Sequence, residues 1–161
     1  MLLIITFVII NLKPVFMYEA IFNLHSYWAY LVLLILIIAV INALIKVFGD
    51  KEYEAKDFRI SLFTLIVSHI QLLIGVLLYF VSPKFDLWSQ LGSEVMKNPL
   101  ARLYLVEHPL VNIIAVALIT IGYSKHKKKL TSKAKLKPIA IFYSIALVLL
   151  LSRIPWSIWL A

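Results

Sequence analysis

Four apolar segments, each long enough to cross a membrane, constrain this sequence more than any other feature. Their expected bounds are about 20–47, 60–81, 100–123 and 138–156. Because an α-helix rises ~1.5 Å per residue, each segment reaches about the ~30 Å of a hydrocarbon core. Only helices and closed barrels span lipid, and these segments lack the alternating pattern of barrel strands. The sequence therefore predicts an all-α integral membrane protein, a four-helix transmembrane bundle.

The composition agrees with this class. Of the 161 residues, 63% are hydrophobic, whereas a soluble domain is typically about 45–50% apolar. The chain has no cysteine, which excludes disulfides, thiolate metal sites and cysteine nucleophiles. It also has no Gly-rich phosphate loop and no His-x-x-x-His pair, so nothing indicates nucleotide binding or a zinc hydrolase. We expect residues 17–161 to form one four-helix transmembrane domain.

Residues 1–16 form an apolar N-terminal extension. Asn11, Lys13 and Pro14 end its apolar run, and about ten apolar residues are too few to span a membrane. Met17 lies directly before the first span. Two interpretations therefore stay open, a start residue assigned too far upstream and an interfacial helix.

The basic residues predict how the chain is oriented. Eleven of the sixteen lysines and arginines lie in or beside loops 48–59 and 124–137. Loops rich in lysine and arginine stay on the cytoplasmic side. We therefore expect both loops to be cytoplasmic and both termini outside. The basic run 125–137 then contacts anionic lipid and is not a nucleic-acid site.

The outer loop, residues 83–98, carries apolar side chains at a helical spacing. Trp88, Leu91, Val95 and Met96 fall three to four residues apart or next to each other. This spacing is typical of a short amphipathic helix that lies in the membrane interface.

Three histidines within or at the rim of the spans are the candidate functional residues. Ionisable side chains are costly in hydrocarbon, and neutral imidazole is the usual nitrogen ligand of haem iron. His69 lies roughly 15 Å, His108 roughly 23 Å and His25 roughly 31 Å from the cytoplasmic end of its span. We expect His69 and His108 to bind the iron of one haem b, and His25 to be a further cofactor-binding residue. His126 lies between two lysines and is expected to be a solvated loop residue.

Two charged residues accompany His108. Glu107 precedes it and is expected to orient a histidine, carry protons or contact headgroups. Arg102 is expected to pair with a haem propionate or with a lipid headgroup. Pro109 has no amide hydrogen, so it leaves the Leu105 carbonyl without its helical partner.

Several short stretches of residues 18–156 resemble small bacterial membrane proteins labelled "cytochrome B". The resemblance implies a four-helix fold in the bacterial cytoplasmic (inner) membrane, with His25, His69 and His108 as the family's histidines. The stretches are Leu24-His25-Ser26, Leu62-Phe63-Thr64, Ser68-His69-Ile70-Gln71-Leu72, Tyr79-Phe80-Val81-Ser82-Pro83, Val106-Glu107-His108-Pro109 and Ile139-Ala140-Ile141-Phe142-Tyr143.

These observations favour a b-type haem membrane protein that acts in electron transfer, either as a carrier or as the haem subunit of a respiratory assembly. Its expected partners are the lipid bilayer and a quinone or a larger respiratory membrane complex. An electron-transfer or accessory subunit is favoured over a stand-alone enzyme. The alternative is a haem-free accessory subunit in which the histidines only form hydrogen bonds. A third reading is a small copper or quinone-linked membrane factor.

Overall fold

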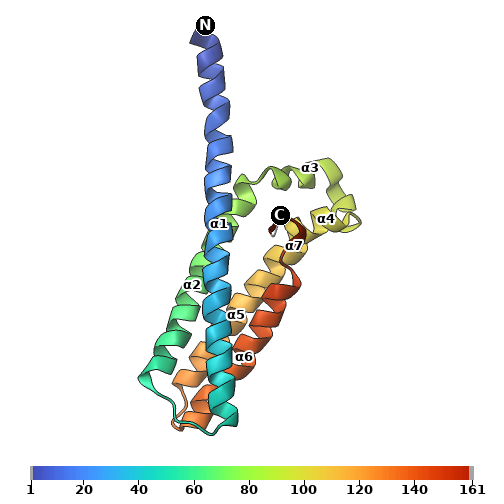
Figure 1. The fold of residues 1–161 in the computed structure, drawn as a ribbon. Coiled ribbons are helices and arrows are strands. Elements are labelled where there is room, and N and C mark those ends of the chain that lie inside the picture. The colour runs from blue at the N-terminus through green and yellow to red at the C-terminus, as the bar shows by residue number, and fades with distance from the viewer. Residues whose placement is uncertain (1, 160–161) are drawn as a thin grey trace.

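A computed structural model shows an almost entirely helical chain (Figure 1). It describes the backbone of residues 2–159 and the side chains of residues 16–157 and 159, and no strand occurs in this part of the chain. The long helices are α1 (Leu2–Phe48), α2 (Ala55–Val81), α5 (His108–Lys127) and α6 (Ser132–Ser152). The side chains of residues 1–15, which make up most of the expected N-terminal extension, lie outside the described residues. The backbone of that extension continues α1.

Four stretches are long and apolar enough to cross a membrane: Phe16–Phe48, Ala55–Val81, Pro99–Lys127 and Ser132–Ser152. The third stretch joins α4 (Pro99–Arg102) and the π-helical turn η3 (Leu103–Glu107) to α5. The prediction of an all-α chain with four long apolar helices is confirmed.

The long helices lie side by side (Figure 1). Helix α1 packs against α2 and α6, and α5 packs against α6 and α2. The N-terminal part of α1 extends beyond the other helices, at the end where α3, α4 and α7 (Trp156–Trp159) lie. The α1–α2 and α5–α6 connections lie together at the opposite end, where Lys133 pairs with Asp50 at 2.8 Å.

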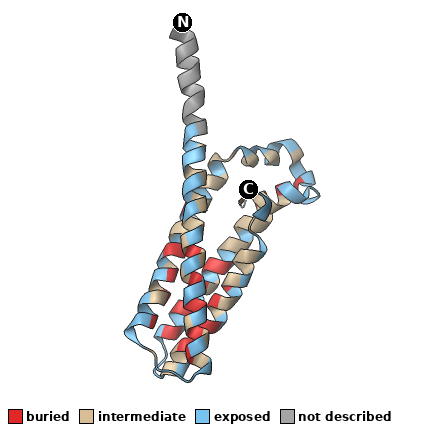
Figure 2. Ribbon diagram, in the orientation of Figure 1, coloured by how far each residue is buried: buried red, intermediate tan, exposed pale blue. Residues whose placement is uncertain are grey.

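The core is concentrated near those two connections, where most of the buried residues lie (Figure 2). Small residues let the helices approach closely, and larger side chains fill the remaining space. The buried cluster comprises Leu36, Ala39, Val40, Ala43, Ala115, Ile119, Ile139, Ala140, Tyr143 and Ala146. Tyr143 donates a hydrogen bond to the Ser61 carbonyl at 3.0 Å.

Helix α6 differs from its expected bounds of 138–156. It begins at Ser132, so Pro138 lies inside the helix and not in its first turn. The expected end at Trp156 was also wrong. The helix stops at Ser152 because Ile154 precedes Pro155, and a residue before proline is biased away from helical geometry.

The segment between α2 and α4 consists of three short helical pieces, where one short helix was expected. It runs through the 3₁₀ turn η1 (Pro83–Asp86), α3 (Leu87–Leu91) and the 3₁₀ turn η2 (Gly92–Met96). Gly92 has φ +52°, a conformation that favours glycine. Val95 is fully buried against Ala101 and Leu105. The segment is therefore anchored to the rest of the protein at its C-terminal end.

Candidate functional site

The helices line a cavity of about 410 Å³ at the end away from the core, and the cavity is partly open to the outside. Its walls come from α1, α2, α5 and the chain after α6, and most of the lining side chains are apolar. Protein interiors are normally packed with few voids larger than a water molecule. A cavity of this size and character is typical of a binding site for a small molecule.

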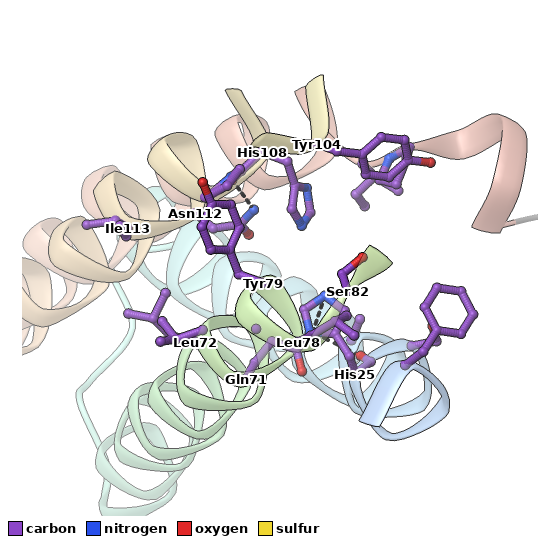
Figure 3. Close-up of a pocket in the computed structure, with 18 of the residues that line it drawn as sticks. His25, Gln71, Leu72, Leu78, Tyr79, Ser82, Tyr104, His108, Asn112 and Ile113 are labelled. Carbon is purple, nitrogen blue, oxygen red and sulfur yellow. Dashed lines mark hydrogen bonds between the residues drawn. The ribbon is translucent and has the colours of Figure 1, made fainter. Parts of the chain in front are cut away.

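Two of the three candidate histidines face each other across this cavity (Figure 3). His25 comes from α1 and His108 from the start of α5. Their ring centroids are 6.2 Å apart, and the ring planes lie at 70°. The structure therefore brings His25 and His108 together, although their depths counted along the sequence differ.

The backbone around Pro109 determines where His108 lies. The π-helical turn Leu103–Glu107 ends with the His108 amide bonded to the Leu103 carbonyl. The Leu105 carbonyl, which loses its helical donor to Pro109, accepts a hydrogen bond from the Tyr79 hydroxyl at 3.1 Å. The expected free carbonyl is thus satisfied from α2.

A backbone carbonyl orients the His108 ring. The Nδ1 atom lies 2.7 Å from the carbonyl oxygen of Arg153. A carbonyl can only accept, so Nδ1 carries the proton. In the neutral ring Nε2 then keeps a free lone pair. A histidine that binds a metal usually donates its other ring nitrogen to a carbonyl or carboxylate in this way.

Glu107 holds the chain segment that orients His108. Its carboxylate pairs with Arg102 Nε at 2.8 Å and with Arg153 Nε at 3.3 Å. Arg102 also donates to the Met96 carbonyl at 2.8 Å. Neither Glu107 nor Arg102 is among the cavity-lining residues. The expected propionate contact of Arg102 therefore has no counterpart in this geometry, whereas Glu107 is placed to position His108 through Arg153.

His25 lies against α2, where Gly75 leaves room for its ring. A Cβ atom on residue 75 would lie 3.2 Å from His25 Cε1. The Gln71 amide nitrogen donates to the His25 carbonyl at 3.0 Å and lies 3.3 Å from Nδ1 and 3.5 Å from Nε2. The amide thus has its short bond with the backbone, and it does not fix the tautomer of the ring.

His69 lies elsewhere. It is exposed on α2, with Nδ1 2.8 Å from the Leu65 carbonyl and Nε2 3.4 Å from Thr120 Oγ1. Thr120 follows His108 by twelve residues, which is roughly 18 Å along a helix. Two ligands of one metal lie within about 4 Å of each other. The expected pairing of His69 with His108 at one iron therefore does not match this arrangement.

One lysine gives the cavity a positive charge. Lys84, in η1, lines the cavity with its Nζ 4.2 Å from the centre of the Tyr104 ring. Burial lowers the pKa of Lys84. A ligand with an apolar body and an acidic group would match this wall, because the acid would compensate a partly desolvated cation.

The sequence did not reveal a buried ion pair at the opposite end. Lys46 and Asp57 are only 6% and 2% exposed and lie 2.7 Å apart. Asn42 donates to the same carboxylate at 2.7 Å. The expectation treated Lys46 as a loop charge. One sequence pattern could have indicated that Asp57 is not a free loop charge. Asp57 follows Glu54 by three residues, and the two form a capping box at the start of α2.

His126 was wrongly expected to be solvated. It is 1% exposed, and its ring packs against Tyr123 at 4.8 Å and Tyr53 at 6.0 Å between centroids. The reason is that α5 continues to Lys127 and turns this histidine towards α2 and the loop before it. Its lysine neighbours point outward.

Comparison with known proteins identifies no relative of this chain, since no protein-family profile, curated protein or solved structure matches it.

Proposed function

We propose that this chain is an integral membrane protein that holds a b-type haem between His25 and His108 and acts in electron transfer. One observation carries the proposal. Two imidazoles on different helices face each other at 6.2 Å across a cavity lined mostly by apolar side chains.

The separation of the two rings would leave room for one metal ion held by both imidazoles. Two metal–nitrogen bonds of about 2 Å each, together with the distances from the nitrogens to the ring centres, come to roughly 6 Å. His108 also offers an oriented ring with a free Nε2 lone pair. His25 reaches the same space from the opposite wall (Figure 3).

The number of ligands favours haem over a bare metal ion. Among the described residues, no group of three or more histidine, aspartate or glutamate side chains could hold a metal ion. Protein zinc sites use three or four such ligands, whereas haem iron needs only one or two axial ones. Two histidines without a third ligand therefore support haem more than a zinc-type site.

The protein would contribute orientation and burial, and the haem would supply one-electron chemistry when bound. The apolar walls and the histidine ligands would together set the reduction potential of the haem. Lys84 is the candidate partner of a propionate, and Glu107 would hold Arg153 and through it His108. A quinone or a larger respiratory membrane complex would be the electron-transfer partner.

We further propose that the chain lies in the bacterial cytoplasmic membrane with loops 48–59 and 124–137 on the cytoplasmic side. Both loops are rich in lysine, which favours that side. The Asp50–Lys133 pair, which joins residues of the two loops, supports a common side. In this orientation the cavity would lie in the outer half of the membrane.

A haem-free accessory subunit is the second candidate. One observation favours it: His69 and His108 each already have a hydrogen bond to a backbone carbonyl. Histidines satisfied in this way can be purely structural.

Haem content separates the two candidates. Wild-type protein, expressed with a haem precursor and purified in detergent, should contain about one haem per chain by the pyridine haemochrome method. His25→Ala and His108→Ala should each lose most of it, because each removes one axial nitrogen. His69→Ala is the matched control and should keep it. A colourless wild type, or full haem content in both cavity variants, would refute the haem proposal.

A further inference from the structure

A second recess lies at the lysine-rich end, between the C-terminus of α5 and the N-terminus of α6. Its volume is about 510 Å³. Four lysines line it, together with apolar side chains of α6 that include Pro138 and Phe142. The lysines are Lys125, Lys128, Lys129 and Lys137.

The two helices that flank the recess pack closely at Gly122. A Cβ atom on Gly122 would lie 2.8 Å from Phe142 Cβ and 3.2 Å from the Pro138 carbonyl. A side chain at position 122 would therefore force the helices apart. Lys125 extends over the Phe142 ring, with Nζ 5.9 Å from its centre.

The four recess lysines carry uncompensated charge. Among the residues that the structure describes, no carboxylate lies within ion-pair distance of any of them. Nearby Lys133, by contrast, pairs with Asp50 at 2.8 Å. Four like charges around one recess repel each other, and a bound anion would relieve this repulsion.

The recess opens onto an apolar strip of the same helix. Ile141, Ile145 and Val148 are all exposed and follow each other at spacings of four and three residues, so they share one face of α6. A ligand that fits both features has an anionic head and an apolar tail.

We propose that this recess binds the phosphate headgroup of an anionic phospholipid, with an acyl chain along the strip of Ile141, Ile145 and Val148. Basic pockets between membrane helices on the cytoplasmic side are suited to anionic headgroups. The inference rests on the membrane placement proposed above and is independent of haem.

Native mass spectrometry of the detergent-purified chain tests the site. Dioleoyl phosphatidylglycerol should bind at least about tenfold more tightly than dioleoyl phosphatidylcholine, since only the first has net negative charge. The recess variant K125Q/K128Q/K129Q/K137Q should lose this preference. The matched control K51Q/K56Q/K97Q/K133Q removes four lysines outside the recess and should keep it. The double variant K128Q/K129Q should lose part of the preference for phosphatidylglycerol. It replaces the fourfold variant in the test if that variant does not fold.

Three results would overturn the proposal. The first is equal binding of the two lipids to the wild type. The second is an undiminished preference for phosphatidylglycerol in both recess variants. The third is displacement of phosphatidylglycerol by equimolar inorganic phosphate, because the ligand would then be a free anion. Membrane fractionation of the expressing cells, carried out before detergent is added, shows whether the chain is in the membrane at all. Its absence there would count against the proposed membrane placement and not against the recess alone.

Discussion

At the scale of single residues, Pro109 explains much of the geometry around His108. Because the proline has no amide hydrogen, the Leu105 carbonyl lacks its helical donor and accepts a hydrogen bond from the Tyr79 hydroxyl instead. The backbone before His108 forms a π-helical turn at this point. The sequence predicted the free carbonyl. It could not predict its donor, because Tyr79 lies 26 residues away on another helix.

Tyr79→Phe should destabilise the protein by about 1–3 kcal/mol, because it leaves the half-buried Leu105 carbonyl without a partner. Thermal unfolding in detergent measures the change. Tyr27→Phe, on an exposed tyrosine of α1, is the control and should have little effect. Equal stability of the two variants would mean that the Tyr79–Leu105 bond contributes nothing.

Glu107→Gln should weaken haem binding by roughly tenfold, because groups that orient a ligand typically affect affinity by this order. The neutral amide loses the ion pair with Arg153, and the Arg153 carbonyl is the group that orients His108. Haem titration into the apoprotein measures it. Glu94→Gln removes an exposed pair with Lys97 and is the control. An unchanged affinity for Glu107→Gln would remove Glu107 from any positioning role.

At the scale of helices, the four apolar segments could be predicted from composition and length, but the rotation of each helix could not be derived from depth. Helix α2 buries Asp57, Ser61, Thr64 and Ser68, which recur at helical spacing on one face. Small residues face neighbouring helices in membrane proteins. This pattern was available in the sequence and would have placed His69 outside the interior.

Helix register explains why depth along the sequence did not pair His25 with His108. Depth counted from the cytoplasmic ends separated His25 from His108 by about 8 Å. Tilt and packing set the actual register, and contacts such as Trp28 Nε1 with the Val67 carbonyl at 3.0 Å fix α1 against α2. Such contacts join residues far apart in sequence, so residue counting along one helix cannot reveal them.

The buried pair between α1 and α2 gives a prediction at this scale. Asp57→Asn should cost about 3–5 kcal/mol, because it leaves Lys46 buried without its counter-charge. Unfolding in detergent measures the loss, and Asp50→Asn on an exposed pair should cost much less. The double variant K46M/D57L should recover most of the stability. A small effect of Asp57→Asn would show that Lys46 finds another partner, such as Glu54 at 3.3 Å.

At the scale of the whole molecule, packing is uneven along the helices (Figure 2). One half has a close-packed core, and the other half contains the partly open cavity with His25 and His108. This division fits a protein in which one half supports the fold and the other holds a ligand. This division could not be predicted from the sequence, because it depends on how the side chains of different helices pack against one another.

The proposed orientation predicts the side of each connection. Reporter fusions at Ser93 and Lys129 should report opposite sides of the membrane, with Lys129 cytoplasmic, because the lysine-rich loops stay inside. A fusion at Asp50 should report the same side as Lys129. Same-side signals from Ser93 and Lys129 would contradict both the number of spans and their orientation.

The most direct test of the central claim is the electron paramagnetic resonance spectrum of the oxidised, haem-loaded wild-type protein. Ligation by His25 and His108 should give a low-spin ferric signal, because two imidazoles complete six-coordination of the iron. The same signal should persist in His69→Ala, whose side chain lies outside the cavity. A high-spin signal from five-coordinate iron in the wild type, or no haem signal after haem-supplied expression, would contradict the account.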